Sequence, residues 1–201
     1  MKVFNLLLAG VGGQGILLAA EALGTAAIRE GLNVRVSEIH GAAQRGGSVV
    51  SNIRIGEGAL APTMVEGTAD IILGLEPLET LRNIRFASEK TLVVMNSQII
   101  VPPGIYLKGE EESIPSLEKV LEKIRLFTRN VIVVDALKLA KDAGSAVAQN
   151  IVLVGALAAT EKLPIKTETL KSVVEELVPA KYLEVNRKAF ELGYNYVKSI
   201  R

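Results

Sequence analysis

The fold is decided by the stretch Val3-Phe4-Asn5-Leu6-Leu7-Leu8-Ala9, which continues directly into Gly10-Val11-Gly12-Gly13-Gln14-Gly15. Its first half is a nearly continuous apolar run, which is typical of a strand buried on both faces of a parallel sheet. Its second half satisfies the pattern G-x-G-x-x-G. The residues that follow, 16–30, are apolar almost all round, as expected of a buried helix. A strand, a glycine turn and a helix in this order predict an α/β domain.

The rest of the chain alternates between strand-like and helix-like segments. The expected strands are 33–37, 49–55, 69–75, 91–95 and 131–135, and the expected helices are 76–83, 116–127, 136–143, 145–160, 167–177 and 181–198. This alternation predicts a three-layer, Rossmann-like α/β fold with a mostly parallel, mixed sheet and C-terminal helices. No linker or internal repeat interrupts the pattern, so we expect residues 1–201 to form a single domain.

The composition excludes several classes of site. The chain has no cysteine, which excludes disulfides, a cysteine nucleophile and a thiolate-bound iron–sulfur cluster. It has one histidine and no suitable acidic cluster, so we expect no metal site. A net charge of +1 disfavours nucleic acid or an anionic membrane as a partner. No apolar run is long enough to span a bilayer, and the N-terminus lacks a secretory cleavage pattern, so we expect a cytoplasmic protein.

The chain is nevertheless unusually apolar. With glycine counted and tyrosine left out, roughly 56% of its residues are apolar, against an ordinary 45–50%. With no membrane segment to absorb this surplus, it predicts a large apolar interface with another subunit.

A second informative stretch is Ser37-Glu38-Ile39-His40-Gly41-Ala42-Ala43-Gln44-Arg45-Gly46-Gly47-Ser48, which we expect to be a loop between two strands. Polar, glycine-rich loops on an apolar scaffold are where binding and catalysis usually occur. His40 could transfer protons or bind a substrate carboxylate, which are common roles of histidine. Arg45 offers a planar fork suited to a carboxylate or a coenzyme phosphate, and Glu38 could orient His40 or pair with Arg45. Alternatively, His40 is a hydrogen-bonded structural residue, and the Glu38–Arg45 pair only fastens the loop.

The glycine turn is a candidate anion site, because backbone amides at a helix N-terminus attract negative charge. The candidate binding residues are Gly12, Gly13, Gln14 and Gly15. A purely structural turn is the alternative, in which Gln14 caps its own turn or contacts the second loop, since consecutive strands are usually neighbours. Glu38 lies near the position of a ribose-binding acid. However, residues 39–47 are too few for a parallel crossover, so we do not expect a dinucleotide site.

Taken together, the two motifs resemble those of the gamma-type subunits of the 2-oxoacid:ferredoxin oxidoreductases. The form His-Gly-x-x-Gln-Arg-Gly-Gly-Ser, from His40 to Ser48, is similar to that of the indolepyruvate branch of this family. Pyruvate-type relatives usually carry a shorter Ser-Glu-x-Arg-Gly-Gly loop. The resemblance extends to Asn150, which opens an apolar helix, and to Asn186 with Phe190 and Gly193 in the last helix.

The resemblance implies a subunit of an enzyme that oxidatively decarboxylates aryl pyruvates such as indolepyruvate to acyl-coenzyme A. It implies a partner α subunit that carries thiamine diphosphate and iron–sulfur clusters, with ferredoxin as the acceptor and coenzyme A as co-substrate. His40, Arg45 and Glu38 would then be catalytic residues in a pocket shared with the partner. Gln44 and Ser48 would join the glycine turn in cofactor binding. With no cysteine and no thiamine-binding Gly-Asp-Gly pattern, the chain would be inactive alone.

Three alternatives stay open at this point. The subunit could serve another 2-oxo acid, such as pyruvate or 2-oxoglutarate, because the partner could set the substrate. The chain could instead be a stand-alone NAD-dependent oxidoreductase, active without a partner. It could also be a non-enzymatic scaffold, which would tolerate substitution of His40 and Arg45.

Overall fold

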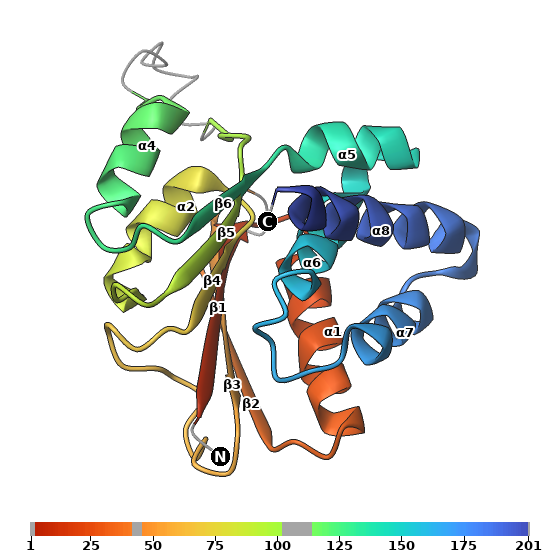
Figure 1. The fold of residues 1–201 in the computed structure, drawn as a ribbon, viewed down its shortest axis with the longest axis horizontal. Helices are drawn as coiled ribbons and strands as arrows, with labels where there is room; N and C mark the ends of the chain where they lie inside the picture. Colours follow the sequence, from red (N-terminus) through yellow and green to blue (C-terminus); the bar gives the residue numbers. More distant parts are fainter. Residues whose placement is uncertain (1–2, 42–45, 102–113, 201) are drawn as a thin grey trace.

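A computed structural model describes residues 3–41, 46–101 and 114–200 of the chain (Figure 1). Its centre is a six-stranded sheet with the order β2-β3-β1-β4-β5-β6. The strands are β1 (Phe4–Val11), β2 (Val34–His40), β3 (Ser48–Ile55), β4 (Ile71–Gly74), β5 (Leu92–Asn96) and β6 (Val131–Val134). The pairs β1–β4, β4–β5 and β5–β6 are parallel, whereas β3 is antiparallel to both β1 and β2. The predicted mixed, mostly parallel sheet is therefore confirmed.

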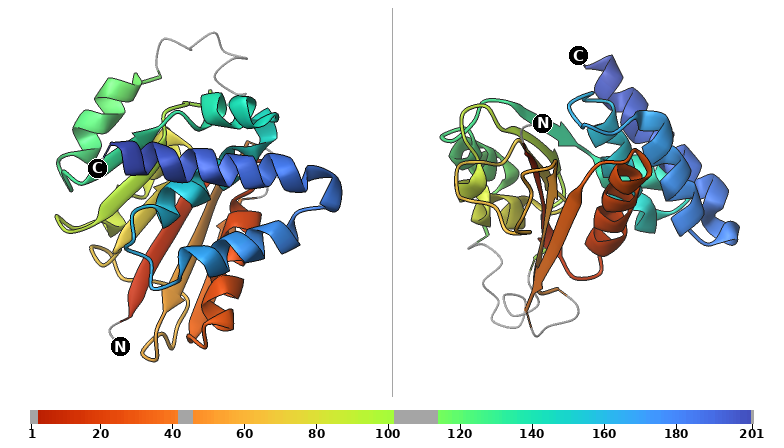
Figure 2. Two further views of the ribbon diagram at one scale, coloured as in Figure 1. Left: turned by 45° about the vertical axis from the view of Figure 1, so that its right-hand side comes forward. Right: turned by 90° about the horizontal axis from the view of Figure 1, so that it is seen from below.

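Helices cover both faces of this sheet, which confirms the three-layer α/β prediction (Figures 1 and 2). One face carries α2 (Pro77–Arg82) and α4 (Leu117–Ile124). The other carries α1 (Ile16–Arg29), α5 (Ala136–Ala143), α6 (Gln149–Ala158), α7 (Thr167–Leu177) and α8 (Leu183–Ser199). Short 3-10 turns are η1 (Ile84–Phe86), η3 (Ala146–Ala148) and η4 (Ala180–Tyr182). No helix in the described ranges has both the length and the apolar character needed to cross a bilayer.

Side-chain caps fix several of the helix starts. The Glu76 carboxylate accepts a hydrogen bond from the backbone N–H of Glu79, and Pro77 follows as the first residue of α2. Ser116 caps α4 by accepting a hydrogen bond from the N–H of Lys119. Asp135 caps α5 in the same way.

Three local predictions are corrected by the structure. The polar stretch does not begin as a loop at residue 37, because β2 continues to His40. The expected helix 145–160 begins as the 3-10 turn η3 before α6. The helix after the glycine turn is not buried all round, since Leu17 is 49% exposed and Ile28 is 64% exposed.

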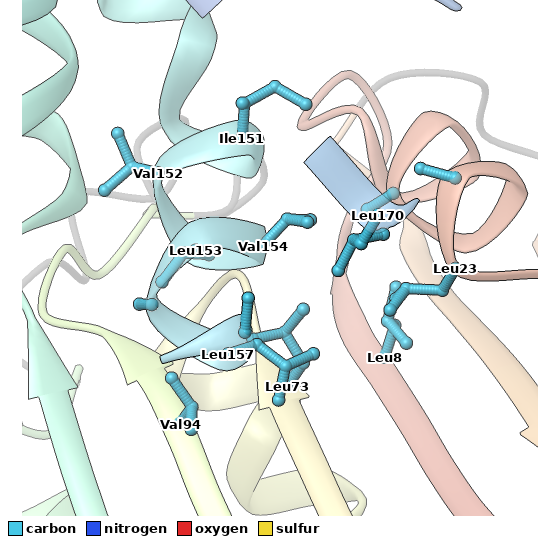
Figure 3. Packing of buried hydrophobic residues seen from close by; sticks show 14 of the residues in the cluster. Leu8, Leu23, Leu73, Val94, Ile151, Val152, Leu153, Val154, Leu157 and Leu170 are labelled. Atoms are coloured by element: carbon cyan, nitrogen blue, oxygen red, sulfur yellow. The ribbon is translucent and has the colours of Figure 1, made fainter. Parts of the chain in front are cut away.

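The alternation of β1 divides the core between the two faces. Leu6 and Leu8 belong to the cluster beneath α1 and α6, whereas Leu7 belongs to the cluster beneath α2 and α4. Figure 3 shows the first cluster, in which Leu8 and Leu73 of the sheet lie beside side chains of α1, α6 and α7. Because both faces are buried, the central strands are continuously apolar.

Helix α6 is enclosed within the chain. Every residue from Asn150 to Ala158 is buried, because α6 lies between the sheet and α8. Part of the apolar surplus therefore serves an internal helix rather than a subunit interface. The apolar residues left for a partner are the exposed ones, among them Leu17, Ile39 and Val147.

Candidate functional site

The candidate site lies at the carboxyl ends of β1 and β4, which are neighbours in the sheet. The chain leaves β1 through α1 on one face and leaves β4 through α2 on the opposite face (Figure 1). This reversal is a topological switch point, where open α/β sheets bind their ligands. The glycine turn and the end of the β2–β3 hairpin meet here. Gly12 donates its N–H to the Gly47 carbonyl (2.8 Å) and accepts the Gly46 N–H (3.2 Å).

Gln14 holds the glycine turn in place. Its Oε1 accepts the backbone N–H of Val11 (2.9 Å), and its Nε2 donates to the carbonyl of Leu75 at the end of β4 (3.0 Å). The prediction that Gln14 caps its own turn is confirmed. Its side chain also bridges the ends of β1 and β4, so the crevice between these strands is occupied by the protein itself.

Asn150 supports the same turn from α6. Its Nδ2 donates to the Gly15 carbonyl (3.2 Å), and its side chain is buried. Gly15 has a φ of 74°, and a Cβ at this position would lie 2.4 Å from Asn150 Nδ2. Only glycine satisfies both the backbone angle and the close approach. Gly13, with a φ of 98°, would meet nothing within 4 Å and faces open space.

A residue that the sequence analysis missed joins this network from β5. Buried Asn96 donates through Nδ2 to the Leu75 carbonyl (3.3 Å) and to Oε1 of Gln149 (3.1 Å). Its Oδ1 accepts the first N–H of α5, that of Ala136 (3.3 Å). An asparagine at the end of an apolar strand was the available signal, because such a buried amide requires partners.

The hairpin places His40 beside the glycine turn. Glu38 and His40 share one face of the edge strand β2, and both side chains are exposed. His40 lines a cavity of about 620 Å³ together with Gly13, Gly15 and Leu17. Among the described residues, no hydrogen bond joins Glu38 to His40, whose Nδ1 lies 3.5 Å from the Gly41 carbonyl oxygen. Gln44 and Arg45 lie outside the described residues, so their roles stay predictions.

A second cavity, of about 330 Å³, lies on the other side of the glycine turn. It shares Gly13, Gly15 and Leu18 with the first cavity. Its outer wall is formed by Val147 and Tyr182, which are 84% and 48% exposed. The glycine turn thus separates two hollows with largely apolar walls. Such hollows suit an amphipathic ligand or a partner's side chains.

Ser48 lies in a third hollow, of about 240 Å³, between the hairpin and α2. Its hydroxyl donates to Oε2 of Glu79 (2.5 Å). Glu76 also lines this hollow and is 1% exposed. Burial raises the pKa of Glu76, while the backbone N–H groups of Glu79 and Ile100 act in the opposite direction. The sequence analysis missed both carboxylates. The available signal in the sequence was the pair of glutamates on either side of Pro77 and Leu78, directly after an apolar strand.

The geometry does not match a dinucleotide site. The prediction that the first two strands are neighbours is wrong, because β3 lies between β1 and β2. Glu38 is therefore two strand spacings, about 10 Å, from β1. A ribose-binding acid ends the strand next to β1 instead. The side chain of Gln14 further fills the crevice into which the pyrophosphate would enter. The sequence analysis argued that residues 39–47 are too few to form a parallel crossover between β2 and β3. These two strands pair antiparallel, which confirms that part of the prediction.

Comparison with known proteins identifies the family. A family model described as pyruvate ferredoxin/flavodoxin oxidoreductase matches residues 5–196. The chain belongs to this family. Among curated relatives of the pyruvate ferredoxin/flavodoxin oxidoreductase family, it is 41% identical over 201 residues to the indolepyruvate oxidoreductase subunit IorB of Thermococcus kodakarensis. The alignment covers 100% of this chain and 98% of that relative. The common gamma subunit of the pyruvate/ketoisovalerate oxidoreductases of the same organism is 27% identical over 188 residues, covering 92% of each chain.

Solved structures of the family share the fold. The gamma subunit of a keto/oxoacid ferredoxin oxidoreductase from Geobacter sulfurreducens superposes with a TM-score of 0.69 at 22% identity, covering 98% of this chain and 99% of that chain. The 2-oxoglutarate:ferredoxin oxidoreductase of Magnetococcus marinus superposes with a TM-score of 0.72 at 21% identity. That match covers 100% of this chain but 32% of the longer one. The same fold therefore occurs both as a separate subunit and as part of a larger polypeptide.

The side chains that could act as metal ligands limit which cofactors this chain can hold. With no cysteine, it cannot supply thiolate ligands to an iron–sulfur cluster. Within the part of the chain that the structure describes, no three His, Asp or Glu side chains gather as a metal site. Iron–sulfur clusters with cysteine ligands would thus have to be held by another chain of such an enzyme.

Proposed function

We propose that this chain is the non-cluster-bearing subunit of a ferredoxin-dependent oxidoreductase that converts aryl pyruvates, indolepyruvate first among them, to acyl-coenzyme A. The observation that carries the proposal is the 41% identity over the full length to an indolepyruvate oxidoreductase subunit, against 27% to a pyruvate/ketoisovalerate gamma subunit. The alignment behind this identity covers 98% of that relative.

In this assignment, a partner α subunit holds the thiamine diphosphate and the iron–sulfur clusters, and this chain has no cysteine that could ligate a cluster. The clusters pass the electrons of decarboxylation to ferredoxin, and coenzyme A accepts the acyl group. Residues 1–201 are proposed to act as one domain, and the complex is proposed to work in the cytoplasm.

The contribution of this chain is a pocket wall at the carboxyl edge of its sheet. His40 and Gly13 face the same cavity, and Leu17 on its rim is exposed. Contact with a partner would bury this rim, exclude water and strengthen polar interactions inside. His40 is proposed to hold or move a proton there, Arg45 to bind a carboxylate or phosphate, and Glu38 to orient one of them.

The glycine turn is proposed to bind the anionic end of a ligand, such as a coenzyme A phosphate. Helix α1 begins without a side-chain cap, and Gly13 and Gly15 border both cavities. Gly12, Gln14 and Ser48 use their described polar groups internally, so their proposed contribution is to hold this surface in shape. Gln44 is proposed to line the same pocket.

The decisive experiment is co-expression of this chain with a candidate cluster-bearing α subunit. Ferredoxin reduction would be followed with indolepyruvate, phenylpyruvate and pyruvate in turn, with and without coenzyme A. We expect coenzyme A-dependent activity that is highest with the aryl pyruvates and absent from either chain alone. Preference for pyruvate would overturn the substrate assignment, and activity of this chain alone with NAD would overturn the subunit assignment.

A further inference from the structure

The two edges of the sheet are protected to different degrees. Strand β6 ends the sheet on one side and β2 ends it on the other (Figure 1). Strand β6 is four residues long, and Tyr196 of α8 donates its hydroxyl hydrogen bond to the carbonyl of Val133 (3.1 Å). Strand β2 is seven residues long, contains no proline and pairs, among the described residues, with β3 alone. A long, uncovered edge of this kind can accept a further strand.

The hydrogen bonds of the hairpin show which backbone groups of β2 face this edge. The N–H of Gly56 donates to the carbonyl of Asn33 (2.8 Å), so these two opposite residues form a hydrogen-bonded pair. Such pairs alternate along an antiparallel ladder, so the backbone groups of residues 35, 37 and 39 point towards β3. Those of the alternate residues point outwards. In the described part of the chain, no partner is found for the outward N–H and carbonyl groups of Val36, Glu38 and His40.

The side chains of β2 add apolar contacts to this open edge. Nη1 of Arg35 occupies the carbonyl of Val34 (2.9 Å), so the open stretch is residues 36–40. Val36 and Ile39 are 40% and 58% exposed, and they lie on opposite faces of the sheet. A strand that paired with this stretch would therefore gain main-chain hydrogen bonds and an apolar contact on each face.

The open edge leads to the cavity beside the glycine turn. It ends at His40, which lines the cavity of about 620 Å³ together with Gly13 and Leu17. We propose that an extended segment of the partner α subunit adds to β2 as a further strand of the sheet and covers this cavity where the strand ends. This inference rests on the proposed function, which requires a partner at the same rim. The continuity of edge and rim favours this partner over a second copy of the chain.

Amide hydrogen exchange, resolved to single residues, tests the added strand directly. In the isolated chain, the outward amides of Val36, Glu38 and His40 should exchange rapidly. The amides of Ser37 and Ile39 should exchange slowly, because they are bonded to β3. In the co-expressed complex, we expect exchange of the outward amides to slow by at least about tenfold, with little change at the inward ones.

A proline at Val36 tests the same edge by substitution. Val36→Pro removes one outward N–H without removing a bond to β3, and an edge strand tolerates proline at such a position. We expect it to weaken binding of the α subunit by about tenfold, because the added strand loses a hydrogen bond and meets the proline ring. Val36→Ala keeps the N–H and is the matched control, which should bind nearly as the wild type does. Ser37→Pro, whose N–H points to β3, should instead lower the Tm of the isolated chain.

The possible outcomes separate this inference from the proposed function. Rapid exchange of the outward amides in a complex that reduces ferredoxin with aryl pyruvates would overturn the added strand alone. Slow exchange of these amides in the isolated chain at high concentration would assign the edge to a second copy and overturn the α subunit as its occupant. A co-expressed pair that neither associates nor reduces ferredoxin would overturn the proposed function, and this inference with it.

Discussion

Gly155 of α6 faces the backbone carbonyl of Phe190 in α8 so closely that a Cβ at Gly155 would lie 2.0 Å from that oxygen. The relationship is reciprocal, because a Cβ at Gly193 of α8 would lie 1.9 Å from the carbonyl oxygen of Val152. The two helices therefore cross backbone to backbone. Any side chain larger than hydrogen at either position must push them apart.

Substitution at this crossing should be strongly destabilising. Overpacking a core usually costs about 1–3 kcal/mol, and here the clash is with backbone that cannot rotate away. We expect Gly155→Ala to lower the free energy of unfolding by about 3 kcal/mol, measured by urea denaturation. Gly41→Ala is the control, because a Cβ there meets nothing within 4 Å. Equal stability of the two variants would contradict the close crossing.

Gln14 offers a test of the bridge between β1 and β4. Gln14→Glu keeps an acceptor for the N–H of Val11 but places a carboxylate oxygen against the Leu75 carbonyl. Losing that donor should cost about 1–3 kcal/mol of unfolding free energy at neutral pH. Chemical denaturation of the isolated chain measures it, with Gln98→Glu as the control. A cost no greater than that of the control would show that the bridge contributes little.

The ion pair between Arg29 of α1 and Glu176 of α7 predicts a pH-dependent contribution. Arg29 lowers the pKa of Glu176 from 4.5 to about 2. Because the pKa is lower in the folded state, the carboxylate stabilises the fold above pH 4.5. That contribution is lost as the pH falls from about 4.5 towards about 2.

Thermal unfolding of Glu176→Gln measures this effect. The wild type should have the higher Tm at pH 7, and the difference should shrink between pH 4.5 and 2. Both side chains are exposed, so the difference should be small and should weaken with salt. Glu122→Gln on α4 is the control. A Tm difference that stays constant down to pH 2 would contradict the assignment.

Arg45 tests the proposed pocket directly. We expect Arg45→Ala to lower turnover of the assembled complex by more than about tenfold without dissociating the subunits, because a charge-assisted contact to an anionic group is lost. Steady-state ferredoxin reduction measures turnover, and size-exclusion chromatography measures association. Arg35→Ala, an exposed arginine on β2, is the matched control. Unchanged kinetics in Arg45→Ala would refute a role in the site.

Most of the fold could be predicted because local and global signals agree in it. The apolar run of β1 predicts a buried strand, and the apolar residues that follow the glycine turn predict the helix α1. The order of the strands in the sheet could not be predicted in this way, because strands that are consecutive in the sequence need not be adjacent in the sheet. A short connection predicted that residues 39–47 do not form a crossover, but it did not show that β3 would lie between β1 and β2.

The site was predicted less completely for a related reason. Turn chemistry indicated the glycine turn and the polar stretch, so Gln14 and His40 were found. Asn96 and Glu79 lie at the ends of other elements, and their importance comes from partners that are distant in the sequence. A single side chain gives no local sign of such long-range contacts.

The enclosure of α6 also constrains how the chain reaches its native state. Helix α6 is apolar on all sides, and one of those sides is covered by α8, which is synthesised after it. Until α8 packs against it, α6 of a nascent chain has one apolar side exposed to solvent. We therefore expect productive folding to wait until α8, residues 183–199, has left the ribosome, because until then the apolar surface of α6 is available for aggregation.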